Sequence, residues 1–189
     1  MILYLHGFNS APTSHKARAM QGHMAERGLG HLFACPALPH HPREATGLIE
    51  AAMQQAGPDT VTLVGSSLGG FYATHFAEKY SCRAVLIQPA VFPHLGLEAM
   101  LGPQRNLYTG EEFLLTQEHL DELRALDVAA ITRPERYWLF VETGDEVLDY
   151  REAVAFYCGA LHHVVRGGDH AFGSFPEVVP DLVDWAASA

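Results

Sequence analysis

Hydrophobic residues occur along the chain in short runs of strand length, which alternate with longer amphipathic segments of helix length. This rhythm is typical of parallel strands joined by helical crossovers. The apolar runs predict six strands, at Ile2–Leu5, His31–Ala34, Thr60–Val64, Arg83–Ile87, Tyr137–Val141 and His162–Val165.

Most segments between these runs place apolar residues three or four positions apart, as one buried helix face requires. Two of the runs, Val61–Val64 and Leu139–Val141, lack polar alternation and so indicate strands covered on both faces. We therefore predict a three-layer α/β fold with a doubly wound, mostly parallel six-stranded sheet in the order 2-1-3-4-5-6. The predicted helices are Ser14–Glu26, Arg43–Ala56, Leu68–Tyr80, Tyr150–Cys158 and Pro176–Ala187.

One stretch, 93–136, is too long for a simple crossover. It contains glycine and proline punctuation and a helical pattern near Thr116–Leu126. It is either a small helical insertion that caps a site or a decorated crossover. Because domains usually contain roughly 100–200 residues, we expect a single domain over residues 1–189.

Composition and charge exclude several classes of function. The net charge is −10 and only two residues are lysines, so we expect no nucleic-acid partner. No apolar run approaches the roughly 18 residues of a membrane span. The twelve histidines and three cysteines lack the spacing of known metal or redox sites, so we predict no metal and no cofactor. The first residues form a strand-like run and not a leader, which favours a cytoplasmic protein.

The most specific motif follows the third predicted strand, where Gly65-Ser66-Ser67-Leu68-Gly69 leads into a helix-like segment. Gly-x-Ser-x-Gly between a strand and a helix is the nucleophile-elbow pattern. The glycines leave room on a sharp turn where a Cβ would clash, and the helix N-terminus favours developing negative charge. The alternative is a tight turn without chemistry. We predict that Ser67 is a nucleophile.

A second motif, His6-Gly7-Phe8, directly follows the first predicted strand. It resembles a loop that supplies an oxyanion donor in serine hydrolases. We expect the backbone N–H groups of Phe8 and Leu68 to form the oxyanion hole, and His6 to shape the loop. The alternative is a turn that only ends the strand.

Loops after the last two predicted strands complete the order serine, acid, histidine. A serine hydroxyl needs a histidine base, and a carboxylate must orient that histidine. His170 precedes the final predicted helix, and its alternative role is a surface loop histidine. We prefer Asp145 as the acid. Asp149 comes next and is expected to cap a helix, while Glu142 is too near the strand and Asp169 adjoins His170.

With these motifs, the chain resembles the small YqiA-like esterases of the α/β-hydrolase superfamily. The resemblance implies a compact hydrolase core, Ser67, Asp145 and His170 as catalytic triad, and esterase activity toward acyl esters or thioesters. Relatives often have asparagine where this chain has Gln88, a departure that leaves the triad intact. The matching stretches are Leu3–Ser10, Gly65–Thr74, Gln88–Ala90, Thr143–Tyr150 and Gly167–His170.

We therefore expect a serine hydrolase that cleaves small-molecule carboxylic esters or acyl thioesters through an acyl-serine intermediate. Two alternatives stay open: an acyltransferase that uses the same triad, and a non-catalytic ligand-binding protein with a hydrolase fold. The substrate pocket is expected to include Phe8, Leu68, Phe92 and parts of 93–136.

Overall fold

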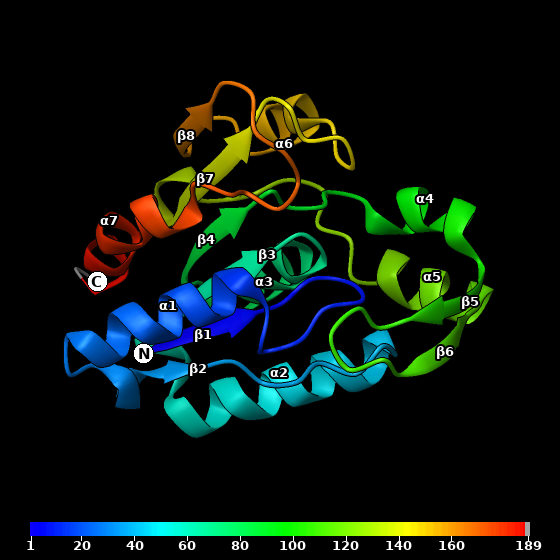
Figure 1. Cartoon of the computed structure of the whole chain (residues 1–189), viewed down its shortest axis with the longest axis horizontal. Coiled ribbons are helices and arrows are strands. Elements are labelled where there is room, and N and C mark those ends of the chain that lie inside the picture. The colour runs from blue at the N-terminus through cyan, green and yellow to red at the C-terminus, as the bar shows by residue number, and fades with distance from the viewer. Residues whose placement is uncertain (188–189) are drawn as a thin grey trace.

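The computed structural model describes residues 1–187 and places a twisted parallel sheet between two layers of helices (Figure 1). The sheet has six strands in the order β2-β1-β3-β4-β7-β8, and every neighbouring pair is parallel. This order agrees with the predicted one once the two strands of an additional hairpin within 93–136 are counted. The sheet strands are β1 (Ile2–Leu5), β2 (Phe33–Ala34), β3 (Thr62–Ser66), β4 (Arg83–Ile87), β7 (Tyr137–Glu142) and β8 (Leu161–Val165).

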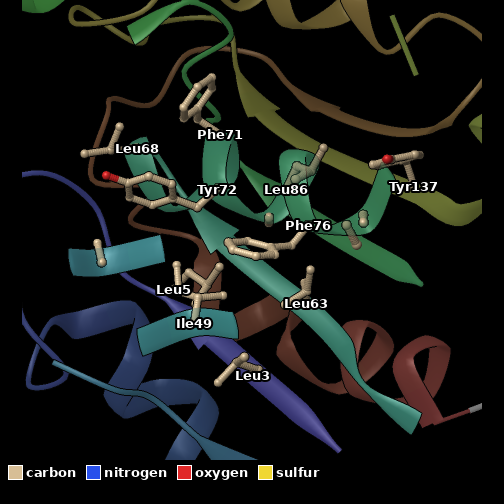
Figure 2. Packing of buried hydrophobic residues seen from close by; sticks show 14 of the residues in the cluster. Leu3, Leu5, Ile49, Leu63, Leu68, Phe71, Tyr72, Phe76, Leu86 and Tyr137 are labelled. Carbon is tan, nitrogen blue, oxygen red and sulfur yellow. The ribbon is translucent and has the colours of Figure 1, made fainter. Parts of the chain in front are cut away.

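Alternate residues of each strand supply two separate hydrophobic cores, because successive side chains point to opposite faces of a sheet. Leu3 and Leu5 of β1 belong to the core beneath α2 (Pro42–Ala56) and α3 (Leu68–Tyr80). Figure 2 shows this core, where Ile49 and Phe76 approach the sheet.

The intervening residues of β1, Ile2 and Tyr4, belong to the opposite core. This second core lies beneath α1 (His15–Glu26) and α7 (Phe175–Ala187), which contact each other. The remaining helix outside 93–136, α6 (Tyr150–Phe156), packs on the side of α2 and α3 through Ala153. The predicted three-layer α/β fold is confirmed.

Two predicted strands begin later than their apolar runs. The second was expected from His31, but Gly30–Leu32 forms a 3₁₀ turn and β2 keeps only two residues, which pair with Ile2 and Leu3 at the edge of the sheet. The third was expected from Thr60, but a 3₁₀ turn at Pro58–Thr60 delays β3 to Thr62.

The stretch 93–136 contains more structure than its sequence indicated. The predicted helix is α5 (Gln117–Arg124), which Thr116 caps. An antiparallel hairpin of β5 (Gly102–Arg105) and β6 (Glu112–Leu115) was not predicted, because two four-residue strands, one beginning Gly-Pro, show no clear alternation. The other elements are α4 (Pro93–Leu97) and the 3₁₀ turns η3 (Glu98–Met100) and η4 (Pro134–Arg136).

The turn between β3 and α3 depends on backbones that touch. Ser67 has φ 54° and ψ −120°, an unfavourable conformation for a residue with a side chain. A Cβ on Gly65 would lie 2.2 Å from the carbonyl oxygen of Gly69, and a Cβ on Gly69 would lie 1.9 Å from that of Leu5. The expectation that both glycines make room for the turn is therefore confirmed.

We predict that Gly69→Ala lowers the free energy of unfolding by about 3 kcal/mol or more, because the new methyl group meets the rigid backbone of β1. The matched control is Gly47→Ala in α2, where a Cβ meets nothing within 4 Å. That variant should gain roughly 1 kcal/mol from helix propensity. Urea unfolding of both variants measures the difference, and a Gly69→Ala variant as stable as the wild type would contradict this account.

Candidate active site

Three loops at the carboxyl edge of the sheet bring Ser67, His170 and Asp145 into one hydrogen-bonded row. The Nε2 atom of His170 lies 3.2 Å from Ser67 Oγ, and its Nδ1 atom lies 2.8 Å from Asp145 Oδ2. Because an ionised carboxylate only accepts, Nδ1–H donates to Asp145 and Nε2 is free to accept from the Ser67 hydroxyl. Sequence reasoning selected these three residues, and the structure places them in contact.

The loop after β7 holds Asp145 in one orientation. Oδ1 of Asp145 accepts hydrogen bonds from the backbone N–H groups of Val147 (2.8 Å) and Leu148 (2.9 Å), which leaves Oδ2 facing His170. Burial raises the pKa of Asp145, but the bonds from His170 and the two amides outweigh it and lower the pKa overall. The carboxylate is therefore ionised at neutral pH and suited to stabilise an imidazolium.

The loop that carries His170 is fixed by a buried carboxylate at the end of β7. Oε2 of Glu142 accepts from the N–H of Asp169 at 2.8 Å, and Oε1 accepts from the hydroxyl of Ser174 at 2.7 Å. Gly168 has φ +73°, and a Cβ there would lie 1.9 Å from Glu142 Oε2. Glu142 thus holds the loop on both sides of His170 and does not act as its partner.

A second residue that holds this loop, Gln88, was missed by sequence reasoning as a site residue. Its side chain is buried after β4, donates through Nε2 to Asp169 O at 2.9 Å, and accepts through Oε1 from Glu142 N at 3.2 Å. The available signal was the departure at this position from the asparagine that the resemblance to YqiA-like esterases implies. An amide one methylene longer reaches across from β4 to the histidine loop.

The other candidate acids have different partners. Asp149 caps α6 by accepting from Arg151 N at 3.0 Å and also binds Arg151 Nε at 2.8 Å, and these bonds lower its pKa. The expected capping role is confirmed. Asp169 accepts from the N–H of Ala171 at 2.9 Å.

The segment of residues 6–10, which we call the oxyanion loop because it contains the predicted donor Phe8, crosses directly over the elbow. A Cβ on Gly7 would lie 3.1 Å from Ser67 Cβ. His6 donates from Nδ1 to Gly7 O and accepts through Nε2 from Leu38 N, both at 3.0 Å, so it shapes the loop as expected. Within residues 1–187, the backbone N–H groups of Phe8 and Leu68 donate no hydrogen bond.

A cavity of about 1030 Å³ extends from Ser67 and His170 between α4 and α6. It is lined mainly by apolar side chains, which include the three predicted pocket residues Phe8, Leu68 and Phe92. Its acidic lining residues in the described part of the chain are Asp149 and Glu152. The other lining residues are Asn9, Ala90, Val91, Pro93, Leu95, Gly96, Leu97, Met100, Leu107, Val147, Leu148, Ala155 and Phe156.

Metal-ligand clusters and membrane-spanning helices are both absent from residues 1–187. No group of three or more His, Cys, Asp or Glu side chains there has a geometry that could hold a metal ion. None of the helices in that range has the length and apolar composition needed to cross a membrane.

The lowered pKa of Asp145 predicts how its contribution to stability depends on pH. That contribution is complete above the unfolded-state pKa of about 4 and is lost as the pH falls through the lower folded-state pKa. The difference in unfolding free energy between wild type and Asp145→Asn should therefore be largest at neutral pH and shrink below about pH 4. Urea titrations across this range measure it, with Asp181→Asn at an exposed position of α7 as control. A difference that grows on acidification would contradict the assignment.

Comparison with solved structures identifies the fold. The chain superposes on a protein from Agrobacterium vitis S4 with a TM-score of 0.78 and 20% identity, over 98% of this chain and 87% of the other. Mouse alpha/beta hydrolase domain-containing protein 10 superposes with a TM-score of 0.75 and 16% identity, over 99% of this chain and 89% of the mouse chain. Est1E from Butyrivibrio proteoclasticus with bound ferulic acid superposes with a TM-score of 0.70 and 15% identity, over 100% of this chain and 89% of the Est1E chain. The fold is that of the α/β hydrolases.

Sequence comparison identifies the family. A UPF0227 protein of Yersinia pseudotuberculosis serotype O:1b is 27% identical over 94 residues, and one of Pectobacterium carotovorum is 26% identical over 94 residues. Each match covers 49% of this chain and 52% of the relative, so it spans about half the length of these curated relatives. The model of the uncharacterised protein family UPF0227 matches residues 1–187. The chain therefore belongs to the UPF0227 family.

Proposed function

We propose that the protein is a serine hydrolase that cleaves carboxylic esters or acyl thioesters through an acyl-Ser67 intermediate. The observation that carries the proposal is the row of contacts from Ser67 Oγ through His170 to Asp145, 3.2 and 2.8 Å long, at one end of an apolar cavity. A surface histidine or an ordinary turn serine has no need for this arrangement.

In the first half-reaction, His170 Nε2 takes the hydroxyl proton as Ser67 Oγ attacks the carbonyl carbon of the substrate. The electron pair of the C=O bond moves to its oxygen, which the N–H groups of Phe8 and Leu68 stabilise. The tetrahedral intermediate then collapses, and the leaving alcohol or thiol takes the proton from His170. Asp145 stays ionised throughout and stabilises the imidazolium.

In the second half-reaction, water attacks the acyl carbon while His170 Nε2 takes one of its protons. Collapse of the second tetrahedral intermediate returns that proton to Ser67 Oγ and releases a carboxylic acid. The ferulic acid bound to Est1E, a protein of the same fold, is also a carboxylic acid and supports this chemistry by analogy.

We predict that Ser67→Ala abolishes hydrolysis of a small chromogenic acyl ester and labelling by a fluorophosphonate, because no nucleophile remains on the turn. The control is Ser66→Ala, which removes the adjacent hydroxyl at a buried position of β3. Ser66→Ala should retain labelling. Labelling that survives in Ser67→Ala would refute the nucleophile assignment.

The cavity also predicts the kind of acyl group. Its apolar lining leaves room for an aliphatic chain, and each buried methylene contributes about 0.8 kcal/mol. This corresponds to roughly threefold to fourfold in kcat/KM per methylene while the chain still enters the cavity. We expect kcat/KM to rise from acetyl to octanoyl esters of the same alcohol.

We predict that Leu95→Asp weakens this preference for longer acyl groups, because a carboxylate replaces part of the apolar lining. The position is 61% exposed, so the change should leave the fold intact. Leu114→Asp is the matched control, since Leu114 is 58% exposed in the same stretch but does not line the cavity. A series of 4-nitrophenyl esters measures both variants, and identical chain-length profiles for the two would contradict the assignment of the acyl site.

A further inference from the structure

The turn of the β5–β6 hairpin, residues 106–111, lies against the oxyanion loop. Leu107 N donates to Asn9 O at 3.0 Å, and Asn106 Nδ2 donates to Ser10 O at 2.8 Å. From the loop side, Asn9 Nδ2 donates to Gln104 Oε1 at 3.2 Å. Residues almost one hundred positions apart in the sequence are thus joined at the carbonyl groups of Asn9 and Ser10, the two residues that follow Phe8.

The oxyanion loop needs such restraints. Asn9 has φ +52°, in the left-handed region that costs a residue with a Cβ roughly 1 kcal/mol. Its Oδ1 atom is buried, and within residues 1–187 it has no hydrogen-bond partner. A strained conformation persists only where surrounding contacts determine it, and here those contacts come from the hairpin.

Asn106 has a separate function at each end of its amide. Oδ1 accepts from the N–H groups of Tyr108 (2.9 Å) and Thr109 (3.0 Å), which closes the turn. The backbone of Asn106 also pairs with Glu111 and Gly110 at 2.8 and 3.0 Å. Only the Nδ2 end reaches outward, to Ser10.

The stretch 93–136 is also held to the rest of the molecule beside this turn. Phe113 of β6 meets Phe8 edge to face, with ring centroids 5.9 Å apart. Glu122 of α5 accepts from the N–H of Arg43 at 3.0 Å and lies 3.0 Å from His41 Nδ1. The hairpin is therefore a fixed support for the oxyanion loop.

We propose that Asn106 is a positioning residue for the reaction: its side chain holds the carbonyl group of Ser10, two residues after Phe8, and so helps to fix the loop with the Phe8 N–H pointing at the developing oxyanion. The inference rests on the proposed function. An oxyanion donor stabilises the transition state only when it is already aimed at the position the oxygen will occupy. The stretch 93–136 is then a cap that completes the active site and not a decorated crossover.

Asn106→Asp separates the two ends of this amide. The carboxylate still accepts from Tyr108 and Thr109, but it has no donor for Ser10 O. Loss of a whole oxyanion donor costs about 10²–10³-fold in kcat, and displacement of one should cost less. We expect kcat for a 4-nitrophenyl ester to fall about 10–100-fold, with KM within about twofold of the wild type.

Two further variants separate a loss of the contact with the oxyanion loop from a general disturbance of the hairpin turn. Thr109→Ala removes an acceptor for Glu111 N (3.2 Å) in the same turn without touching the oxyanion loop, and its kcat should stay within about twofold of the wild type. Gln104→Leu removes the acceptor for Asn9 Nδ2 and should lower kcat about threefold to tenfold. Thermal melts identify any variant that fails to fold, and Gln104→Leu then carries the test in place of Asn106→Asp.

The decisive readout compares two ketone inhibitors that differ only in the group beside the carbonyl, trifluoromethyl in one and methyl in the other. A trifluoromethyl ketone adds to Ser67 and places an oxyanion in the hole, whereas the matching methyl ketone binds mainly as a ground-state analogue. Asn106→Asp should lower the affinity for the trifluoromethyl ketone by the same factor as it lowers kcat/KM, and it should leave the affinity for the methyl ketone unchanged.

The inference is overturned if kcat of Asn106→Asp stays within threefold of the wild type, or if Thr109→Ala lowers kcat as much as Asn106→Asp does. It is also overturned if the affinities for the two ketones fall by the same factor. These outcomes differ from failure of the proposed function itself. In that case the wild-type protein would show no turnover that depends on Ser67, and no variant would be informative.

Discussion

The site depends on the close contact between the backbone of β1 and the turn at Ser67. At Gly69 the two backbones leave no room for a single methyl group, since a Cβ would lie 1.9 Å from Leu5 O. This contact fixes the elbow against the strand whose continuation is the oxyanion loop. Ser67 therefore stands beside Gly7 and Phe8 through backbone packing, and no long side chain has to bring them together.

Polar contacts hold His170 and Asp145, the two residues that lie in a row with Ser67. Glu142 and Gln88 are both buried, and both bind the backbone of Asp169 just before His170. Two amides hold Asp145 from its other side. Buried polar groups are stable only when such bonds are complete, and a completed network specifies one geometry. The loops that bear Asp145 and His170 are thus each oriented by their own contacts.

Features that depend on residues adjacent in the sequence could be predicted from the sequence. The strand–turn–helix context of Ser67, the glycines around it and the cap at Asp149 are all local. The strand order follows from the alternation of strands and helices along the chain. The roles of Gln88 and Glu142 could not be predicted, because they depend on how β4 and β7 meet the histidine loop.

The β5–β6 hairpin shows the same limit for secondary structure. Both strands are only four residues long, and the first begins with Gly102 and Pro103, so no periodic pattern of apolar residues predicts them. The hairpin contacts the oxyanion loop, which lies nearly one hundred residues earlier. The contacts that join the stretch 93–136 to residues 6–10 link positions far apart in the sequence, so no local pattern reveals them.

The central claim is that this arrangement makes Ser67 the covalent carrier of the acyl group. The most direct measurement mixes excess protein with 4-nitrophenyl hexanoate, stops the reaction with acid at successive times and locates added mass by peptide mass spectrometry. The account predicts that the first nitrophenol released is matched by a hexanoyl group on the peptide that contains Ser67, which then decays. Full release of nitrophenol with Ser67 unmodified at every time would contradict it.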